Sequence, residues 1–277
     1  MKSLILVFAT MCMVSSAALA QTQNFADCTD QFPGGIVPNA ASRTVTDQCK
    51  VADGKAIFAV RFDTTRKTPN WAVHKLSPQD VKKLMPRKRP RFFPDQNVPE
   101  KDQATDKGYT HSGYSRGHIV PAHDMSWNAD AYHATFNLTN VVPQKQRFNA
   151  GTWLGMEAKL RALVKDKNVT IWDFSGVYGQ VQAEPTIGTA PHNPVVPKCY
   201  YKIIVTQTKA DGPYKVLAAL FRWNDFSKQK TWIKSITSLD QVQQRSGIDF
   251  LQGLVIESPF DADFWGVPMP NSLGDCV

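Results

Sequence analysis

The residues from 112 to 161 constrain the fold and the chemistry of this chain more than any other stretch. They open with the segment SGYSRGHIVPAHD (112–124), continue with TNVVPQKQRFN (139–149) and end in a segment with helical periodicity. This periodicity predicts a helix from about Gly151 to Lys165, with these apolar side chains on its inner face: Trp153, Met156, Leu160, Leu163 and Val164. A histidine after a glycine, a distant asparagine and a helix with Glu and Arg together favour metal-assisted hydrolysis of a phosphodiester.

Such a hydrolysis needs a base for water, positive charge at the phosphoryl oxygens and a proton for the leaving oxygen. His118 follows Gly117, which predicts a sharp backbone turn that presents the imidazole as the base. Asn149 offers an amide oxygen to Mg²⁺, an ion that keeps several waters and needs few protein ligands. Glu157 lies two helical turns further, where it would orient a metal-bound water. Arg161, one more turn along, is predicted to reach Glu157 or a phosphate.

These motifs resemble those of the DNA/RNA non-specific endonucleases of the ββα-metal type, which include secreted bacterial nucleases and mitochondrial endonuclease G. The resemblance extends from about Ala56 to Asp275, and its core is SGYSRGHIVPAHD, the TN-VVPQ-FN run and WxxxE with an arginine four positions later. It implies a ββα-metal nuclease core, Mg²⁺ or Mn²⁺ as cofactor, and cleavage of DNA and RNA to 5′-phosphate ends. Because related nucleases include dimers, a homodimer is compatible with the resemblance.

The resemblance also assigns roles by position. His118 matches the general base, Asn149 the magnesium ligand and Glu157 the residue that orders the water shell of the metal. The other matched positions are three arginines near the scissile phosphate and two supporting polar residues: Arg66, Arg116, Arg161, Asn140 and Gln144.

One position departs from the family pattern. The usual motif reads Asp-Arg-Gly-His, whereas this chain has Ser115 in place of the aspartate. Losing a carboxylate near the ion should weaken metal binding, because second-shell changes alter affinity by roughly 10–100-fold. The base and the ligand remain, so we expect activity; the alternative is a nucleic-acid-binding homologue with attenuated or lost catalysis.

The charge of the chain agrees with a polyanionic substrate. The formal net charge is +8, which favours such partners without identifying one. A basic, proline-broken run lies at 86–94, and it either forms a solvated surface or grips distant phosphates through these residues: Arg87, Lys88, Arg89 and Arg91.

Neighbouring polar residues have plainer expectations. His111, His123 and His133 match no zinc-ligand spacing, so they are predicted to be solvated or to pack. Asp124 is expected to tether a loop, and Trp153 to lie in the core.

The first residues have the pattern of a signal peptide over 1–20. Met1 and Lys2 precede an apolar stretch from Leu4 to Val14, and small residues up to Ala20 provide a cleavage site. The sequence thus predicts an exported protein, periplasmic or secreted. No other long apolar run follows, so no stable membrane association is expected.

Removal of this segment leaves four of five cysteines, an even number that in an exported chain predicts two disulfides. Three pairings are open; we adopt the sequential one, Cys28–Cys49 and Cys199–Cys276, which would tie each terminus to the body. Residues 21–54 are then predicted to be an irregular, disulfide-stapled arm, and residues 55–277 the endonuclease domain.

The remaining periodicity predicts an α+β fold with a mixed, mostly antiparallel sheet flanked by helices. A hairpin is expected from strands at 56–62 and 71–76, with residues 63–70 as its turn. Further strands are predicted at 169–174, 200–206 and 214–221, and helices at 78–85 and 238–247.

Overall fold

The computed structural model of the protein describes residues 24–40, 44–179, 185–222 and 231–270. The predicted signal peptide at 1–20 lies outside these residues. So does Cys276, and the pairing Cys199–Cys276 therefore stays a prediction.

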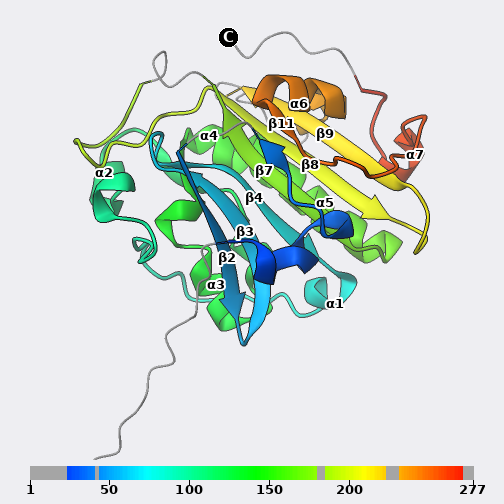
Figure 1. The fold of residues 1–277 in the computed structure, drawn as a ribbon, viewed down its shortest axis with the longest axis horizontal. Helices are drawn as coiled ribbons and strands as arrows, with labels where there is room; N and C mark the ends of the chain where they lie inside the picture. Colours follow the sequence, from blue (N-terminus) through cyan, green and yellow to red (C-terminus); the bar gives the residue numbers. More distant parts are fainter. Residues whose placement is uncertain (1–23, 41–43, 180–184, 223–230, 271–277) are drawn as a thin grey trace, which may run out of the picture.

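A seven-stranded sheet forms the centre of the molecule (Figure 1), and every neighbouring pair in it is antiparallel. The order β10-β9-β8-β7-β4-β3-β2 places β7 and β4 in the middle. The predicted mostly antiparallel sheet flanked by helices is confirmed. The strands, in chain order, are β2 (Val45–Ala52), β3 (Lys55–Asp63), β4 (Thr68–Leu76), β7 (Ile171–Tyr178), β8 (Cys199–Gln207), β9 (Tyr214–Arg222) and β10 (Ile236–Thr237).

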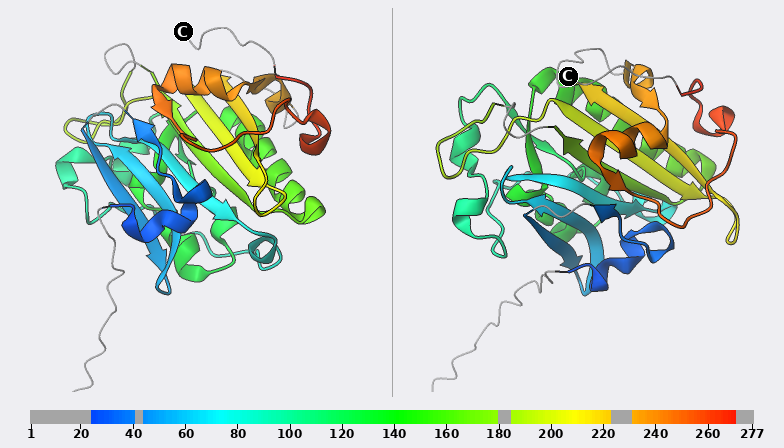
Figure 2. Two further views of the ribbon diagram at one scale, coloured as in Figure 1. Left: turned by 45° about the vertical axis from the view of Figure 1, so that its right-hand side comes forward. Right: turned by 45° about the horizontal axis from the view of Figure 1, so that its top comes forward.

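Each face of this sheet carries its own core, because side chains alternate between the two faces of a strand. Helix α5 (Leu154–Lys167) packs its apolar side chains on one face. The 3-10 helix η1 (Ala26–Gln31) and helix α6 (Leu239–Ser246) cover the other. Figures 1 and 2 show α6 in front of the strands and α5 behind them.

A second, small hairpin lies on the α5 side and connects directly to that helix. Strand β5 (Ser115–His118) pairs with β6 (Val141–Gln144), and His118 lies opposite Val141. The chain continues from β6 into α4 (Gln146–Phe148), a π-helical turn η6 (Asn149–Trp153) and α5. Two strands followed by a helix make up the predicted ββα core.

The described residues also include several short elements. They are η2 (Pro33–Gly35), β1 (Asn39–Ala40), α1 (Pro78–Val81), η3 (Glu100–Asp102), α2 (Asp106–Tyr109), η4 (His123–Met125), α3 (Ala129–Ala134), η5 (Leu138–Asn140), η8 (Thr231–Ser235), β11 (Ile248–Asp249) and α7 (Ala262–Trp265).

The predicted arm at 21–54 needs a correction. Residues 45–52 are not irregular but form β2, which pairs with β3 along its length. The buried side chains of this strand include Gln48 and Lys50, so its alternation of apolar residues is hidden in the sequence. The predicted link between Cys28 and Cys49 is confirmed as a disulfide that ties η1 to β2.

Two predicted helices also differ in extent. The helix predicted at 78–85 covers only Pro78–Val81, with Ser77 as its N-cap. The helix predicted from about residue 151 is part of a longer helical stretch that begins at Gln146 and ends at Lys167. The strands predicted at 56–62, 71–76, 169–174, 200–206 and 214–221 are present, as is the helix at 238–247, each with ends shifted by a few residues.

Candidate active site

His118 ends strand β5 between two aromatic rings. The ring centroids of Phe92 and Phe136 lie 5.3 and 4.8 Å from that of the imidazole. Burial, together with the positive charge of Arg89, lowers the pKa of His118 to about 3, so the ring is neutral at physiological pH. Its Nε2 atom has no hydrogen-bond partner among the described residues. A phosphate bound beside this ring would raise its pKa again, because a nearby anion favours the imidazolium form.

Glycine is required at position 117 for a different reason from the one predicted. It lies inside strand β5, opposite Val142, and not in a sharp turn. A Cβ atom on Gly117 would stand 2.1 Å from Oε1 of Gln144, so only glycine lets this side chain cross the strand. Gln144 is fully buried, and neither polar atom of its amide has a hydrogen-bond partner among the described residues.

Asn140 fixes the chain just after the histidine. Its fully buried side chain accepts a hydrogen bond from the backbone N–H of Val120 (2.9 Å) and donates to the carbonyls of Val120 and Thr135 (both 3.0 Å). The N–H of Ile119 in turn donates to the backbone carbonyl of Asn140 at 3.0 Å. These bonds hold the chain after β5 to η5, which leads into β6.

Two arginines lie against the aromatic pair that encloses His118. The guanidinium carbon of Arg89 is 5.3 Å from the ring centroid of Phe92 and 5.9 Å from that of Phe136. That of Arg116 is 5.8 Å from the Phe92 centroid. One arginine from the basic run and one from the hairpin are therefore placed beside the histidine.

Helix α2 also holds the side chain of Arg116 in place. It forms an ion pair with the carboxylate of Asp106 and donates from Nη2 to the backbone carbonyl of that residue at 2.5 Å. A longer hydrogen bond of 3.3 Å reaches Oγ1 of Thr110. The guanidinium group is thus fixed in direction while part of it remains exposed.

Asn149 opens the π-helical turn between α4 and α5. Its backbone has helical angles (φ −56°, ψ −52°), which excludes the N-cap role that asparagine often takes. Such π turns are frequent at functional sites. Ser115 donates a hydrogen bond to Oε1 of Gln146, so the strand that ends in His118 is tied to the helical stretch that carries Asn149.

Glu157 lies on α5 above a buried group of charges on the central sheet. Below it, Nζ of Lys202 donates to Oδ2 of Asp173 (2.7 Å) and to Oγ of Ser175 (2.6 Å), and these side chains are fully buried. Burial raises the pKa of Glu157 to about 8, while the positive charge of Lys202 acts in the opposite direction. The same ammonium lies 4.5 Å from the ring centroid of Trp153, which is in the core as predicted.

Arg161 pairs with Asp124, where the sequence had offered Glu157 or a phosphate as its partner. Nη1 of Arg161 donates to Oδ1 of Asp124 at 2.6 Å, and Nε2 of His74 lies 3.1 Å from Oδ2 of the same carboxylate. The carboxylate is buried, and the His74 and Arg161 contacts lower its pKa despite burial, which alone would raise it. Asp124 thus tethers its loop, as predicted, and does so by joining α5 to strand β4.

Arg66 lies in the turn between β3 and β4 and is fully buried. Its Nη1 donates to the carbonyl of Gly179 at 2.9 Å, and its own carbonyl accepts from the N–H of Val195 at 2.9 Å. These contacts join distant loops. The predicted place of Arg66 near the scissile phosphate stays a prediction.

The side chains of the basic run at 86–94 lie in different environments. Arg87 donates from Nε to the backbone carbonyl of Ser126 at 2.6 Å, whereas Lys88, Arg89 and Arg91 are exposed. Of these, Arg89 is joined to the site by the contacts described above.

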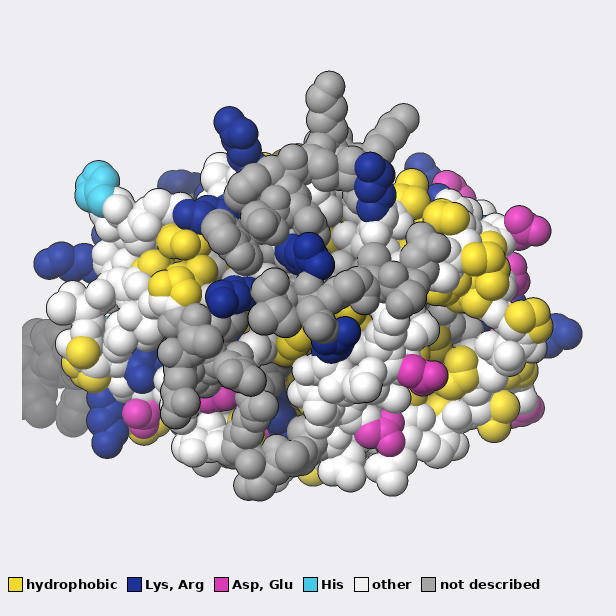
Figure 3. All heavy atoms as spheres, turned by 90° about the horizontal axis from the view of Figure 1, so that it is seen from above, with side chains coloured by type: hydrophobic (Ala, Val, Ile, Leu, Met, Phe, Trp, Pro, Cys, Tyr) yellow, Lys and Arg dark blue, Asp and Glu magenta, His cyan; other side chains and the backbone are white. Residues whose placement is uncertain are grey.

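Seen from above in Figure 3, several Lys and Arg side chains gather in the middle of the face, and most Asp and Glu lie toward its right-hand side.

The donor set near the hairpin suits a hydrated divalent cation. Asn149 would offer a neutral oxygen and Glu157, further along the helix, a carboxyl group; Gln144 adds a buried amide with no partner among the described residues. Within the described part of the chain no three His, Cys, Asp or Glu residues are grouped so that they could hold a metal ion. A cation that binds through few protein ligands and retains its waters, as Mg²⁺ does, fits such a set better than zinc.

Sequence reasoning missed the residues beneath the site. His74, Asp173 and Lys202 occur singly within strand-like segments, where a charged residue normally points to solvent. The signal is visible only after the strands are paired: His74 lies opposite Asp173, and Ser175 opposite Lys202. The predicted environments of His111 and His133 hold, because both are exposed and His133 stacks on Phe93.

Comparison with known proteins agrees with this geometry. The sequence model of the DNA/RNA non-specific endonuclease family matches residues 40–256, so the chain belongs to this family. Its relatives include the mitochondrial nuclease EXOG of Homo sapiens, 30% identical over 209 residues that cover 71% of this chain and 55% of that protein. A nuclease of a Nostoc species is 27% identical over 204 residues, covering 71% of this chain and 72% of that protein.

A solved structure also shares the fold. The crystal structure of the complex of EndoG with EndoGI matches with a TM-score of 0.64 and 21% identity, over 76% of this chain and 86% of that chain. The chain spans between one third and just over half of the length of the EXOG relatives it matches, from Xenopus laevis, Danio rerio, Mus musculus and Homo sapiens.

These relatives correct one prediction. The expected export to the periplasm or the medium is contradicted, because EXOG of Xenopus laevis and Homo sapiens and the yeast relatives are named as mitochondrial nucleases. Among the described residues, no helix has the length and apolar character needed to cross a bilayer.

Proposed function

We propose that this protein is a metal-dependent endonuclease that hydrolyses phosphodiester bonds of both DNA and RNA and leaves 5′-phosphate ends. The observation that carries the proposal is the placement of His118. Its neutral imidazole, whose Nε2 has no partner among the described residues, packs against Phe92, the ring that Arg89 and Arg116 also contact. It ends the strand that Ser115 ties to the helical stretch carrying Asn149. This arrangement fits the membership of the chain in the non-specific endonuclease family.

In the proposed reaction, His118 takes a proton from the water that attacks phosphorus. Asn149 would hold Mg²⁺, with Mn²⁺ as a substitute, and such an ion, when bound, neutralises phosphate charge and supplies an acidic water. Arg116 and Arg89 offset the negative charge that grows on the phosphoryl oxygens. Arg161, aimed by Asp124, does the same from α5. Arg66 stays a predicted phosphate contact, and this proposal adds Arg89 to the predicted arginines because it lies against the rings that enclose His118.

Ser115 gives the proposal its main alternative, a nucleic-acid-binding homologue without turnover. Instead of a carboxylate, its hydroxyl bonds Gln146 and so keeps the hairpin tied to the helix. We take this link between the hairpin and the helix, made without the aspartate, as support for the enzyme. A homodimer stays a prediction, which light scattering at the assay concentration would check.

The decisive experiment is digestion of plasmid DNA and of a structured RNA with Mg²⁺, with Mn²⁺ and with EDTA, followed by end-group analysis. We expect metal-dependent cleavage of both polymers with phosphate on the 5′ ends. Binding without cleavage under every metal condition would support the non-catalytic alternative.

A further inference from the structure

A shallow hollow lies beside the candidate active site, between helix α2 and the loop at 188–192. Its volume is about 540 Å³, within the ~300–1,000 Å³ typical of small-ligand pockets. No acidic residue lines it; the lining consists of Thr105, Lys107, Gly108, Thr110, Ser112, Gly188, Thr189, Ala190 and His192.

Backbone forms much of this hollow. Gly108 and Gly188 approach so closely that a Cβ atom on Gly188 would lie 3.2 Å from Cα of Gly108. The φ angle of Gly188 is +74°, a region that favours glycine. Nδ1 of His192 lies 3.2 Å from the carbonyl of Gln103, which fastens the loop to the segment before α2. The hollow is therefore built by contacts between two segments far apart in the sequence.

A continuous series of contacts joins the hollow to the histidine. Oγ1 of Thr110, on the rim, accepts a hydrogen bond from Arg116. The guanidinium group of Arg116 lies over the ring of Phe92, which packs against His118. Arg116 and His118 are two residues apart in one strand, so their side chains leave the same face of it.

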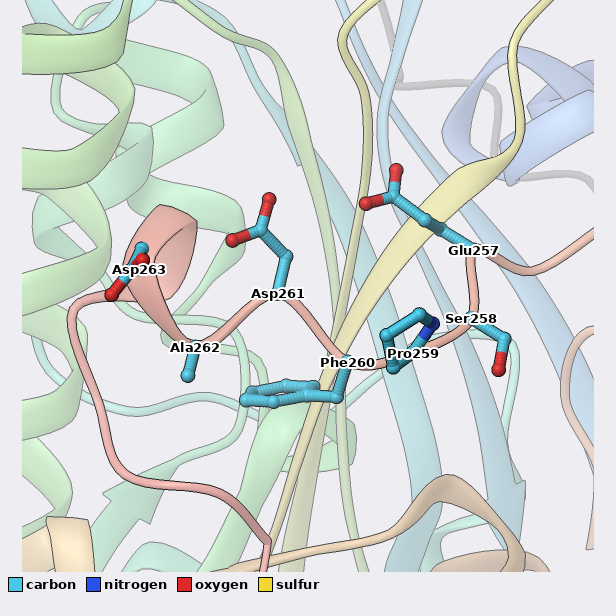
Figure 4. A pocket seen from close by; sticks show the side chains of 7 residues that line it. All are labelled: Glu257, Ser258, Pro259, Phe260, Asp261, Ala262 and Asp263. Atoms are coloured by element: carbon cyan, nitrogen blue, oxygen red, sulfur yellow. The ribbon is translucent and has the colours of Figure 1, made fainter.

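The charge around the hollow suits a phosphodiester strand. Lys107 is exposed on one wall of the hollow. The acidic residue nearest to it in the sequence, Asp106, is paired with Arg116. A second hollow, of about 360 Å³ at residues 257–263, offers a contrast. Its lining contains three carboxylates, those of Glu257, Asp261 and Asp263, two of which point to the same side in Figure 4. Lys215 pairs with Glu257 and Asp261, which leaves this hollow with more negative than positive charge and no attraction for a polyanion.

We infer that the hollow between α2 and residues 188–192 holds the sugar and base of the nucleotide next to the scissile phosphate. The inference rests on the proposed nuclease function and adds a subsite to it. Hydroxyl groups and backbone line the hollow, and they can bond many base edges without selecting one. A subsite of this kind supports cleavage of any sequence while fixing the strand relative to His118.

The test uses single-stranded oligonucleotides that carry one abasic position, with cleavage mapped at each phosphate. In the wild-type protein we expect cleavage to fall about tenfold at one fixed offset from the abasic position, where the subsite has no base to hold. Thr189→Trp, an exposed position on the rim, fills the hollow. It should lower kcat/KM about tenfold on intact strands and leave cleavage at the abasic offset at the wild-type level.

Two further variants keep the test decisive. Lys107→Trp fills the hollow from the opposite wall and also removes a positive charge, so it should lower cleavage of intact strands about tenfold more than cleavage at the abasic offset. Ser258→Trp, in the acidic hollow, should change neither measurement. The inference is overturned if Thr189→Trp cleaves both substrates as the wild type does, or loses activity equally on both. If the wild-type protein cleaves nothing with any metal, the proposed function itself has failed, which is a distinct result.

Discussion

Both faces of the central sheet carry an apolar core, but only the face under α5 also holds the two groups of buried charges described above. The face under η1 and α6 packs aromatic and aliphatic side chains, among them Trp71, Phe174 and Phe250. The face under α5 surrounds a group of buried charges with a similar apolar core. Burying charge usually adds nothing to stability beyond what apolar residues of the same volume would give.

The buried charges form two separate hydrogen-bonded groups. His74, Asp124 and Arg161 form one bonded group, and Asp173, Ser175 and Lys202 form another. Both lie on the side of the sheet that carries α5. Substitutions in these two bonded groups should therefore change activity, whereas substitutions on the aromatic side should mainly change stability.

The largest effect is expected for His118→Ala. General base catalysis contributes roughly 10²–10⁴ in rate, so we expect kcat to fall about a thousandfold, with salt-sensitive binding of DNA retained. Initial rates on plasmid DNA and a fluorescence binding titration measure the two quantities. His133→Ala is the matched control, because this histidine is exposed and stacks on Phe93. Near-normal turnover of His118→Ala would remove this residue from the role of base.

Phe174→Ala is the counterpart on the aromatic side. This side chain is fully buried against Phe32, Trp71 and Phe250, so its truncation should lower the free energy of unfolding by about 3–5 kcal/mol. We expect the specific activity of the folded fraction to be unchanged. Urea unfolding followed by tryptophan fluorescence gives the first quantity, and initial rates at a temperature where the variant is folded give the second. A loss of rate in fully folded protein would break the distinction between the faces.

Asp124→Asn tests whether the buried carboxylate positions Arg161. Without its charge the guanidinium group loses its ion pair, and we expect kcat to fall about tenfold with a smaller change in KM. Arg161→Lys should have a similar effect, and the double variant should be no worse than either single one, because interacting residues are not additive. Additive losses would mean that the two side chains act independently.

The sequence predicted those features that depend on the local pattern of residues. The strands, the helix at 154–167 and the motif around His118 follow from periodicity and from residue types at fixed spacing. Strand β2 and the buried charges could not be predicted, because Lys50, Lys202 and Asp173 have a polar character that local pattern assigns to the surface. Lys50 pairs with the buried Asp95, so its partner lies in a loop 45 residues away. Only the pairing of distant segments shows that such residues are inside.

The smallest predicted effect concerns Glu157→Gln and the pH dependence of stability. The folded protein holds the proton of Glu157 up to a pKa of about 8, whereas an unfolded chain releases it near 4.5. A raised pKa stabilises the folded state below the unfolded pKa, and this contribution is lost as pH rises toward 8. Relative to Glu157→Gln, the wild-type free energy of unfolding should therefore decline as pH rises from 5 to 8. Urea unfolding in EDTA measures both proteins. If the two free energies of unfolding change in parallel with pH, the positive charge of Lys202 already offsets the burial of the Glu157 carboxylate. Burying the charges under α5 would then cost no stability.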